Sequence, residues 1–310
     1  MKQFDSTAIG RAAPVKEWIS AMEDAFRDTA SGLLDVPARS HLERSQGTFL
    51  IMPCFGSRYF ATKLVSTFPG NIKKHEPVIY GTVVLNDGNT GRPLAVLDGS
   101  KLTAMRTAAV GSVGIKHLAP EHASTLGVIG LGVQGLHQAL FACEIRKIKE
   151  LRILDHSEAL MKRFEERFKA IFPHIRVVRC LKAEELCTAS EIIITATGSH
   201  QPVIPASEKC WKGKTLIGIG SFKPEMREFP DELLQDLDQV FVDTMEGLHE
   251  SGDLVIPLDK GVIEREQCYS LESLITGKVL PEGETRFFKS VGMAAFDLYG
   301  ARLVYEKDKG

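Results

Sequence analysis

The feature that most constrains the fold is the stretch LGVIGLGVQGLHQALF, residues 126–141, where a strand-like apolar run passes through glycines into a helical pattern. Gly130, Gly132 and Gly135 have GxGxxG spacing, and Asp155 ends the next apolar run. Such glycines permit a tight turn, a close approach of the backbone to a pyrophosphate, and close packing of helix on strand. The pattern predicts a dinucleotide site, with the pyrophosphate at the helix N-terminus and the ribose at Asp155. The alternative is a tight turn in an α/β domain that binds nothing.

Strands and helices alternate from about residue 122 onward. Strand-like runs occupy residues 124–130, 150–156, 175–179, 191–197, 215–221 and 239–243, and helical patterns occupy residues 133–145, 157–172 and 181–189. This alternation implies right-handed crossovers and a parallel, doubly wound sheet. We therefore predict an α/β Rossmann domain over residues 121–289.

The first third of the chain has the pattern of a mixed α+β unit. A helical pattern covers residues 15–34, and strand-like runs follow at residues 48–53, 59–68 and 78–87. In residues 83–99, turn-forming residues separate two apolar arms, which predicts an antiparallel pair. The last segment, 289–307, predicts a long amphipathic helix of suitable length to pack back on this unit. We expect residues 1–120 and 290–310 to form one domain.

Composition excludes several classes of function. The chain has 310 residues, 44% apolar and 25% charged, and a net charge of -2, so no overall charge attracts nucleic acid or acidic membranes. The N-terminus lacks the apolar segment of a signal peptide, and no run reaches membrane-spanning length. The six cysteines include no CxxC pair, which predicts reduced thiols without metal in a cytoplasmic protein.

The residues after the second strand bear on the type of cofactor. The carboxylate of Asp155 repels a 2′-phosphate, and the following His156 and Ser157 provide no arginine for one. NAD is therefore favoured, with NADP as the alternative because of His156. A second contact region ends a later strand at the same edge of the sheet: Thr195, Thr197 and Gly198. The alternative for these hydroxyls is that they only cap a loop.

Five stretches of the sequence together resemble the ornithine cyclodeaminase and mu-crystallin family along nearly the whole chain. They are LDGSKLTAMRTAAVGSVGIKHLA, ATKLVSTFPGN, the glycine fingerprint, GSFKPEMRE and FKSVGMAAFDL. The resemblance implies a homodimer in which the N-terminal segment and the C-terminal helix form the dimerising, substrate-binding domain. The Rossmann domain is then inserted between them.

The resemblance also implies that three basic residues converge on a substrate carboxylate: Arg39, Lys63 and Arg106. A carboxylate out of water needs such partners, since charge-assisted hydrogen bonds recover its lost hydration. Arg106 is expected to open a helix of small residues. The alternatives are that Arg39 and Lys63 are solvated surface charges and that Arg106 binds the cofactor phosphates.

The chain departs from the family in the loop GSFKPEMRE. Where the cyclodeaminases have an aspartate that handles the substrate amines, this chain has Phe222, which neither holds an ammonium by charge nor moves a proton. Glu225 and Glu228 are the carboxylates of this loop that remain as candidates, although neither occupies the motif position.

A second departure lies in EPVIYGTVVL, where many members have Ser or Thr directly after the proline and this chain has Val78 and Ile79. Side chains alternate along a strand, so Val78, Tyr80 and Thr82 share one face. We therefore expect Tyr80 or Thr82 to supply the missing hydroxyl.

Hydride transfer requires a protein to place the nicotinamide against an electrophilic carbon and to fix the substrate. An α-imino acid suits these residues because its nitrogen is protonated in solution, so no strong general acid is needed. We predict an NAD(H)-dependent reductase of α-imino acids, equivalently an amino-acid dehydrogenase. The alternatives are ornithine cyclodeamination without net redox change and a nucleotide-bound ligand-binding protein with little turnover.

The candidate site residues fall into three groups. The catalytic candidates are Lys63, Arg106, Tyr80 and Thr82, and the substrate-binding candidates add Arg39, Phe222 and Val291. Besides the glycines, Asp155, His156 and the second contact region, the predicted cofactor contacts are Thr107, Val133, Gln134, Ser221 and Ser290.

Overall fold

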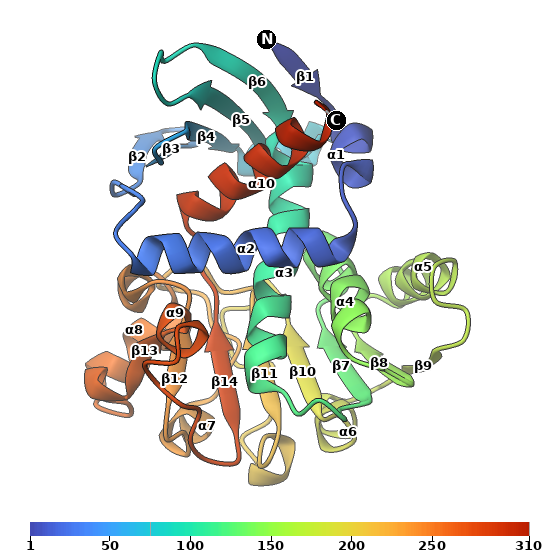
Figure 1. Ribbon diagram of the computed structural model, residues 1–310. Coiled ribbons are helices and arrows are strands. Elements are labelled where there is room, and N and C mark those ends of the chain that lie inside the picture. The colour runs from blue at the N-terminus through green and yellow to red at the C-terminus, as the bar shows by residue number, and fades with distance from the viewer. Residues whose placement is uncertain (75, 310) are drawn as a thin grey trace. The chain divides into compact units, whose positions relative to one another are not determined.

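The computed structural model describes residues 1–74 and 76–309 (Figure 1). The chain divides into two compact units, Met1–Thr107 with Met293–Gly310 and Ala108–Gly292. The first boundary lies at 107/108 rather than at the predicted 120/121. It falls within one continuous helix, α3 (Gly99–Leu118). The second boundary lies at 292/293 rather than at 289/290.

The first unit is a six-stranded sheet with helices packed on one face. The strands lie in the order β1 (Lys2–Phe4), β6 (Pro93–Asp98), β5 (Ile79–Asp87), β4 (Tyr59–Thr67), β3 (Gly47–Phe55) and β2 (Ser40–Arg44). The β1–β6 pair is parallel, and the other pairs are antiparallel, as predicted for the β5–β6 hairpin. The other elements are α1 (Ser6–Arg11), α2 (Val15–Ala30), η1 (Pro69–Lys74) and α10 (Ala294–Lys307).

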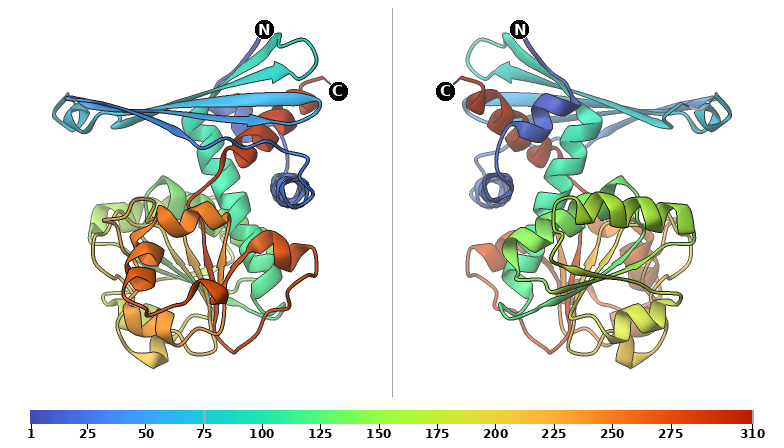
Figure 2. Two further views of the ribbon diagram at one scale, coloured as in Figure 1. Left: turned by 90° about the vertical axis from the view of Figure 1, so that its left-hand side faces the viewer. Right: turned by 90° about the vertical axis from the view of Figure 1, so that its right-hand side faces the viewer.

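Helix α10 packs against β3, β4 and β5 and against α2, so the C-terminal segment completes the first unit as expected. Figure 2 shows α2 and α10 on the same side of this sheet. Helix α2 buries Trp18, Met22 and Phe26, and the Phe26 ring meets the edge of Phe296 with 4.9 Å between ring centres. This apolar stripe at helical spacing is what the sequence pattern predicted.

The second unit is an eight-stranded sheet in which every pair is parallel, so the predicted doubly wound fold is confirmed. The strands lie in the order β13 (Cys268–Ser270), β12 (Val240–Val242), β14 (Arg286–Lys289), β11 (Thr215–Gly218), β10 (Ile192–Thr195), β7 (Thr125–Ile129), β8 (Glu150–Leu154) and β9 (Arg176–Arg179). The helices are α4 (Val133–Ile145), α5 (Glu158–Lys169), α6 (Ala183–Thr188), α7 (Asp231–Gln235), α8 (Gly252–Asp259) and α9 (Leu271–Ile275). Short 3-10 turns are η2 (Glu208–Cys210), η3 (Met245–His249) and η4 (Arg265–Gln267).

The strand order reverses between β7 and β10, and ligands of such sheets bind at the carboxyl ends of the strands near this switch point. Buried side chains from both sides of the switch, among them Ile129, Ile193, Leu216 and Phe287, form the core beneath that edge.

One predicted helix boundary is wrong. The last helix was expected over residues 289–307, but α10 begins at Ala294, and Lys289 ends the buried strand β14. Gly292 has a φ of 85°, a left-handed conformation that separates strand from helix. The sequence did not reveal β14 because a fully buried four-residue strand has no alternating pattern.

Candidate active site

The glycine turn of the second unit has the geometry that its sequence predicts. Gly130 has a φ of 90°, and a Cβ there would lie 2.6 Å from the carbonyl oxygen of Ala196. A Cβ on Gly135 would lie 2.0 Å from the Gly130 oxygen, whereas Gly132, the N-cap of α4, has no atom within 4 Å of its Cβ position. The first turn of α4 contains no acidic residue, so the positive end of the helix dipole faces open space suited to a phosphate.

Asp155 directly follows β8, and its side chain contacts the glycine turn after β7. One oxygen of its carboxylate accepts the N–H of Leu131 at 2.9 Å, and the other accepts the N–H of Ser157 at 3.0 Å. Each carboxylate oxygen has a further lone pair for a ribose hydroxyl. The neighbouring His156 is exposed, with its Nδ1 3.2 Å from the Asp155 carboxylate.

The two residues between Gly132 and Gly135 differ in burial. Val133 is exposed, and Gln134 is half-buried with an Oε1 that has no hydrogen-bond partner among the described residues. An open Gly132 position beside an orphaned amide oxygen fits a site that a dinucleotide completes.

The predicted contacts at the ends of β10, β11 and β14 lie along the carboxyl edge of the sheet. Thr195 is fully buried, Thr197 donates both its N–H and its hydroxyl to Glu228, and Gly198 is exposed. Ser221 is buried, and its hydroxyl is hydrogen-bonded to the Met226 carbonyl and to the Ser251 hydroxyl. The Ser290 hydroxyl and the Val291 N–H both donate to the carboxylate of Asp243. Several predicted hydroxyls therefore already hold the loops in place.

A buried charge cluster lies in the first unit. The Lys63 Nζ is 3.1 Å, and the Arg106 Nε 3.2 Å, from the same oxygen of Asp297. The three side chains are 5%, 7% and 1% exposed, which excludes the surface-charge alternative for Lys63. The half-buried Arg39 is close enough for its charge to lower the pKa of Lys63.

The cluster carries more positive than negative charge. Two cations share one carboxylate, and the other Asp297 oxygen is buried with no hydrogen-bond partner in the described part of the chain. Burial lowers the pKa of Lys63 to about 8; Asp297 opposes this shift, and Arg106 and Arg39 add to it. An anion that joined the cluster would relieve this imbalance, which suits a carboxylate ligand.

Strand register and helix packing position this cluster. Lys63 of β4 pairs with Met52 of β3 and with Val83 of β5, so its side chain lies on the buried face of the sheet. Asp297 comes from the first turn of α10, which covers β4. Arg106 lies in α3 well after its start at Gly99, which corrects the expectation that Arg106 opens this helix.

The predicted hydroxyls do not reach the cluster. Thr82 pairs with Leu64 and Tyr80 pairs with Ser66, which lie one and three residues after Lys63 in β4. Because side chains alternate, Tyr80 and Thr82 lie on the opposite face of the sheet, and Tyr80 is 47% exposed. Assigning either hydroxyl to the site of Lys63 is therefore wrong.

The loop after β11 also corrects a prediction. Glu228 is fully buried and accepts hydrogen bonds from Thr197, Gly220 and Ser221, so it is not available to a substrate amine. Glu225 is exposed, and its carbonyl accepts a hydrogen bond from His200. Phe222 is 47% exposed at the motif position.

Asp297 was not predicted from the sequence. The signal was present, since Asp297 lies on the same helical stripe as Ala301 and Val304, which are buried. A carboxylate on an apolar stripe needs a buried partner of opposite charge.

Three further observations concern metal ligands, membrane-spanning helices and cysteines. No group of three or more metal-ligating side chains occurs in residues 1–74 and 76–309. Within those ranges no helix is long and apolar enough to cross a membrane. All six cysteines are free, and five of them are buried.

The strand–glycine turn–helix motif in a parallel sheet defines a dinucleotide-binding class of protein. The first unit separately contains a buried excess of positive charge. The family model of the ornithine cyclodeaminase/mu-crystallin family matches residues 3–310. The chain belongs to this family, which confirms the resemblance seen in its motifs.

Known proteins resemble the chain over nearly its whole length. It is 36% identical over 282 residues to a Delta(1)-pyrroline-2-carboxylate reductase of Bacillus cereus, covering 87% of this chain and 85% of the relative. The solved Thermococcus litoralis Delta(1)-pyrroline-2-carboxylate reductase, in complex with NADH and L-proline, has a TM-score of 0.93 and 33% identity and covers 100% and 98% of the two chains. An archaeal alanine dehydrogenase dimer with bound NAD has a TM-score of 0.92 and 28% identity and covers 100% and 96%.

Proposed function

We propose that this protein is an NAD(H)-dependent reductase of α-imino acids, with cyclic imino acids of the pyrroline-2-carboxylate type as its first candidate substrates. The reverse reaction is oxidation of the amino acid. The buried cluster of Lys63, Arg106 and Asp297 carries this proposal, because its excess positive charge suits a small carboxylate. The relatives named pyrroline-2-carboxylate reductase support the C=N substrate.

In this proposal the glycine turn and Asp155 hold the dinucleotide, which supplies the hydride when bound. Lys63 and Arg106, with Arg39 nearby, bind the substrate carboxylate. Asp297 orients both cations, since one oxygen of its carboxylate accepts a hydrogen bond from each of them. The imine nitrogen is protonated in solution, so these residues need only fix the iminium and exclude water.

The remaining assignments are also part of the proposal. Phe222 and Val291 contact the substrate. The further cofactor contacts are Thr107, Val133, Gln134, His156, Thr195, Thr197, Gly198, Ser221 and Ser290. The cytoplasmic location stays a prediction.

The test is an NADH-oxidation screen against cyclic imino acids and against imines formed from pyruvate, glyoxylate and oxaloacetate. We expect oxidation of NADH in proportion to the amino acid formed, fastest with a cyclic imino acid. Ligand binding without NADH oxidation by any imine would instead indicate a binding protein. Conversion of ornithine without net NADH turnover would indicate a cyclodeaminase.

We also propose a homodimer formed through the sheet of the first unit. The face opposite α10 exposes apolar side chains, among them Leu42 and Tyr80, which lie on one cross-strand row through Phe49 and Ser66. A patch of this kind marks an interaction site, and the alanine dehydrogenase neighbour is a dimer. In sedimentation velocity we expect a dimer, which Leu42→Lys should dissociate; a monomeric wild-type protein would contradict this proposal.

Asp155 is expected to set the preference for NADH. Replacing Asp155 with Ser removes the charge that repels a 2′-phosphate and one acceptor for the ribose, so NADH should bind more weakly and NADPH relatively better. The measurement is the ratio of kcat/KM for NADH and NADPH. Glu166→Ser, an exposed carboxylate of α5, is the control and should leave the ratio unchanged. Wild-type protein that already prefers NADPH severalfold would contradict the prediction.

A further inference from the structure

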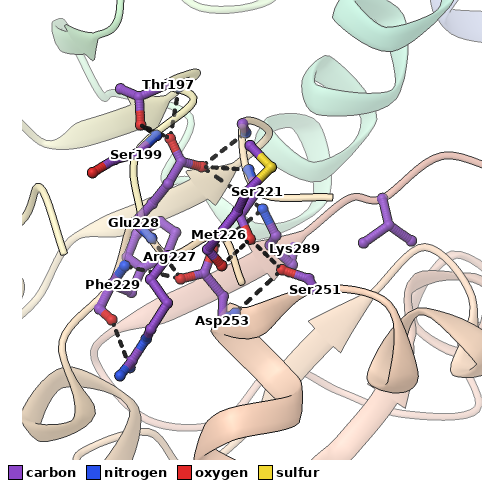
Figure 3. A network of polar contacts seen from close by, with 12 residues as sticks. Thr197, Ser199, Ser221, Met226, Arg227, Glu228, Phe229, Ser251, Asp253 and Lys289 are labelled. Atoms are coloured by element: carbon purple, nitrogen blue, oxygen red, sulfur yellow. Dashed lines mark hydrogen bonds and ion pairs between the residues drawn. The ribbon is translucent and has the colours of Figure 1, made fainter. Parts of the chain in front are cut away.

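Three ionisable side chains, Glu228, Asp253 and Lys289, are fully buried together in the second unit. The Lys289 Nζ lies 3.4 Å from Asp253 and 3.7 Å from Glu228 (Figure 3). Burying three such groups costs several kcal/mol each before pairing, and apolar side chains of similar volume often stabilise a fold better. A contribution to stability alone therefore does not explain this cluster.

Glu228 joins two loops through its carboxylate. One oxygen accepts the N–H and the hydroxyl of Thr197, at 2.7 and 2.9 Å, in the loop after β10. The other accepts the N–H groups of Gly220 and Ser221, at 2.8 and 3.2 Å, in the loop after β11. A single side chain thus fixes the spacing of the two loops that follow neighbouring strands.

Asp253 and Lys289 fix Glu228 in turn. One Asp253 oxygen accepts the backbone N–H groups of Glu228 and Phe229, at 2.7 and 3.0 Å. Lys289 ends β14, the strand beside β11, and supplies the cation. The hydroxyl of Ser251, the N-cap of α8, is 2.6 Å from the Ser221 hydroxyl, so α8, the helix of Asp253, makes a further contact with the loop after β11.

The network lies on one side of the switch point of the sheet. Strands β10, β11 and β14 follow one another on one side of β7, whereas Asp155 follows β8 on the other. A dinucleotide with its adenosine ribose at Asp155 would extend across β7, and the residues at the ends of β10 and β11 would then hold its nicotinamide half.

We propose that Glu228, held by Asp253 and Lys289, is a positioning residue that sets the loops after β10 and β11 against the nicotinamide half of the dinucleotide. This inference rests on the proposed function. Glu228 acts through Thr197, Gly220 and Ser221. Loss of the Glu228 carboxylate should therefore weaken binding of the nicotinamide half and leave binding of the adenosine half unchanged.

Glu228→Gln tests this inference, because an amide presents one oxygen and one NH2 group. In either orientation, one of the two loops faces a donor in place of its acceptor. The matched control is Glu191→Gln. One oxygen of Glu191 accepts the N–H and hydroxyl groups of Ser124 and Thr125, but at the amino ends of β7 and β10, away from the proposed site.

The readout is the dissociation constant of NADH beside that of ADP-ribose, which lacks the nicotinamide, measured by calorimetry on the full chain. For Glu228→Gln we expect NADH to bind about tenfold more weakly, ADP-ribose to bind as in wild type, and kcat to fall about 100-fold, since small misplacement of reacting groups has effects of that size. Glu191→Gln should lower Tm without changing the ratio of the two constants.

If Glu228→Gln does not fold, Ser251→Ala provides a milder test, since it removes the hydroxyl contact to Ser221 without changing charge. We expect the dissociation constant of NADH to rise relative to that of ADP-ribose, as in Glu228→Gln. An unchanged ratio in a folded variant, with wild type binding both ligands, overturns the inference and leaves the proposed function standing. Wild-type protein that binds neither ligand overturns both.

Discussion

Replacing Lys63 by methionine is expected to lower kcat/KM for imine reduction by more than tenfold, while the protein still folds and binds NADH. Lys63 is buried against Asp297, and in the proposed function it provides one of the cations for the substrate carboxylate. Removing one partner of a buried charge pair costs about 2–5 kcal/mol. Methionine keeps the length and the apolar contacts of the side chain, so packing in the sheet is preserved.

Lys16→Met on α2 is the matched control, because Lys16 is exposed on the same unit. It should leave kcat/KM within about twofold of wild type, since isolated surface charges contribute little. Steady-state kinetics at saturating NADH compares the variants. Unchanged kinetics in Lys63→Met would remove Lys63 from the substrate site.

The pH dependence of the same reaction provides a second readout of Lys63. Burial lowers the pKa of Lys63 from 10.5 to about 8 despite Asp297, and the charges of Arg106 and Arg39 add to the effect. Above pH 8 the free enzyme loses this cation, so kcat/KM should decline. Lys63→Arg should remove that decline, because a guanidinium stays protonated.

The effect of Lys63 on stability has the opposite sign. Between pH 8 and 10.5 the unfolded chain binds more protons at Lys63 than the folded chain does. The contribution of this residue to the free energy of unfolding therefore rises with pH in that window, while activity falls. Urea denaturation of wild type and Lys63→Met across this window separates the two effects.

Ornithine is expected not to be converted to proline at an appreciable rate. Cyclodeamination requires the enzyme to release ammonia from the α-carbon and to remove a proton from the distal ammonium before it attacks. The loop after β11 presents Phe222 at the family position for this task, while Glu228 is fully engaged with backbone donors. A phenyl ring at this position neither pairs with the distal ammonium as a carboxylate does nor accepts its proton.

The measurement is proline and ammonia release from L-ornithine with catalytic NAD, using a preparation that reduces a cyclic imino acid with NADH as the positive control. Phe222→Asp should weaken the reduction of substrates with short or apolar side chains. Robust multiple turnover of ornithine by the unmodified protein would overturn the assignment. The exposed Glu225 would then be the first candidate for the missing acid.

Local patterns were sufficient for much of the fold. The β7–α4–β8 unit was predicted because glycine spacing, apolar runs and helical periodicity are each properties of short segments. The boundary errors occur where local patterns are weak: the four-residue strand β14 precedes α10 without alternation, and α3 runs through a unit boundary. Tyr80 and Thr82 were misassigned because strand periodicity shows which residues share a face but not which face is covered.

The nucleotide turn and the alternation of strands and helices could be predicted from the sequence, because they depend on spacing along the chain, and the resemblance to the family singled out the basic residues. The pairing of the buried charges could not be predicted, because it depends on the tertiary structure. Lys63 meets Asp297 across 234 positions of sequence, and Arg106 meets it across 191. Glu228, a candidate acid in the sequence, became a structural acceptor because the loops after β10 and β11 surround it with N–H groups. The role of a buried charge depends on the partners that distant segments bring to it, and short-range patterns contain no record of those partners.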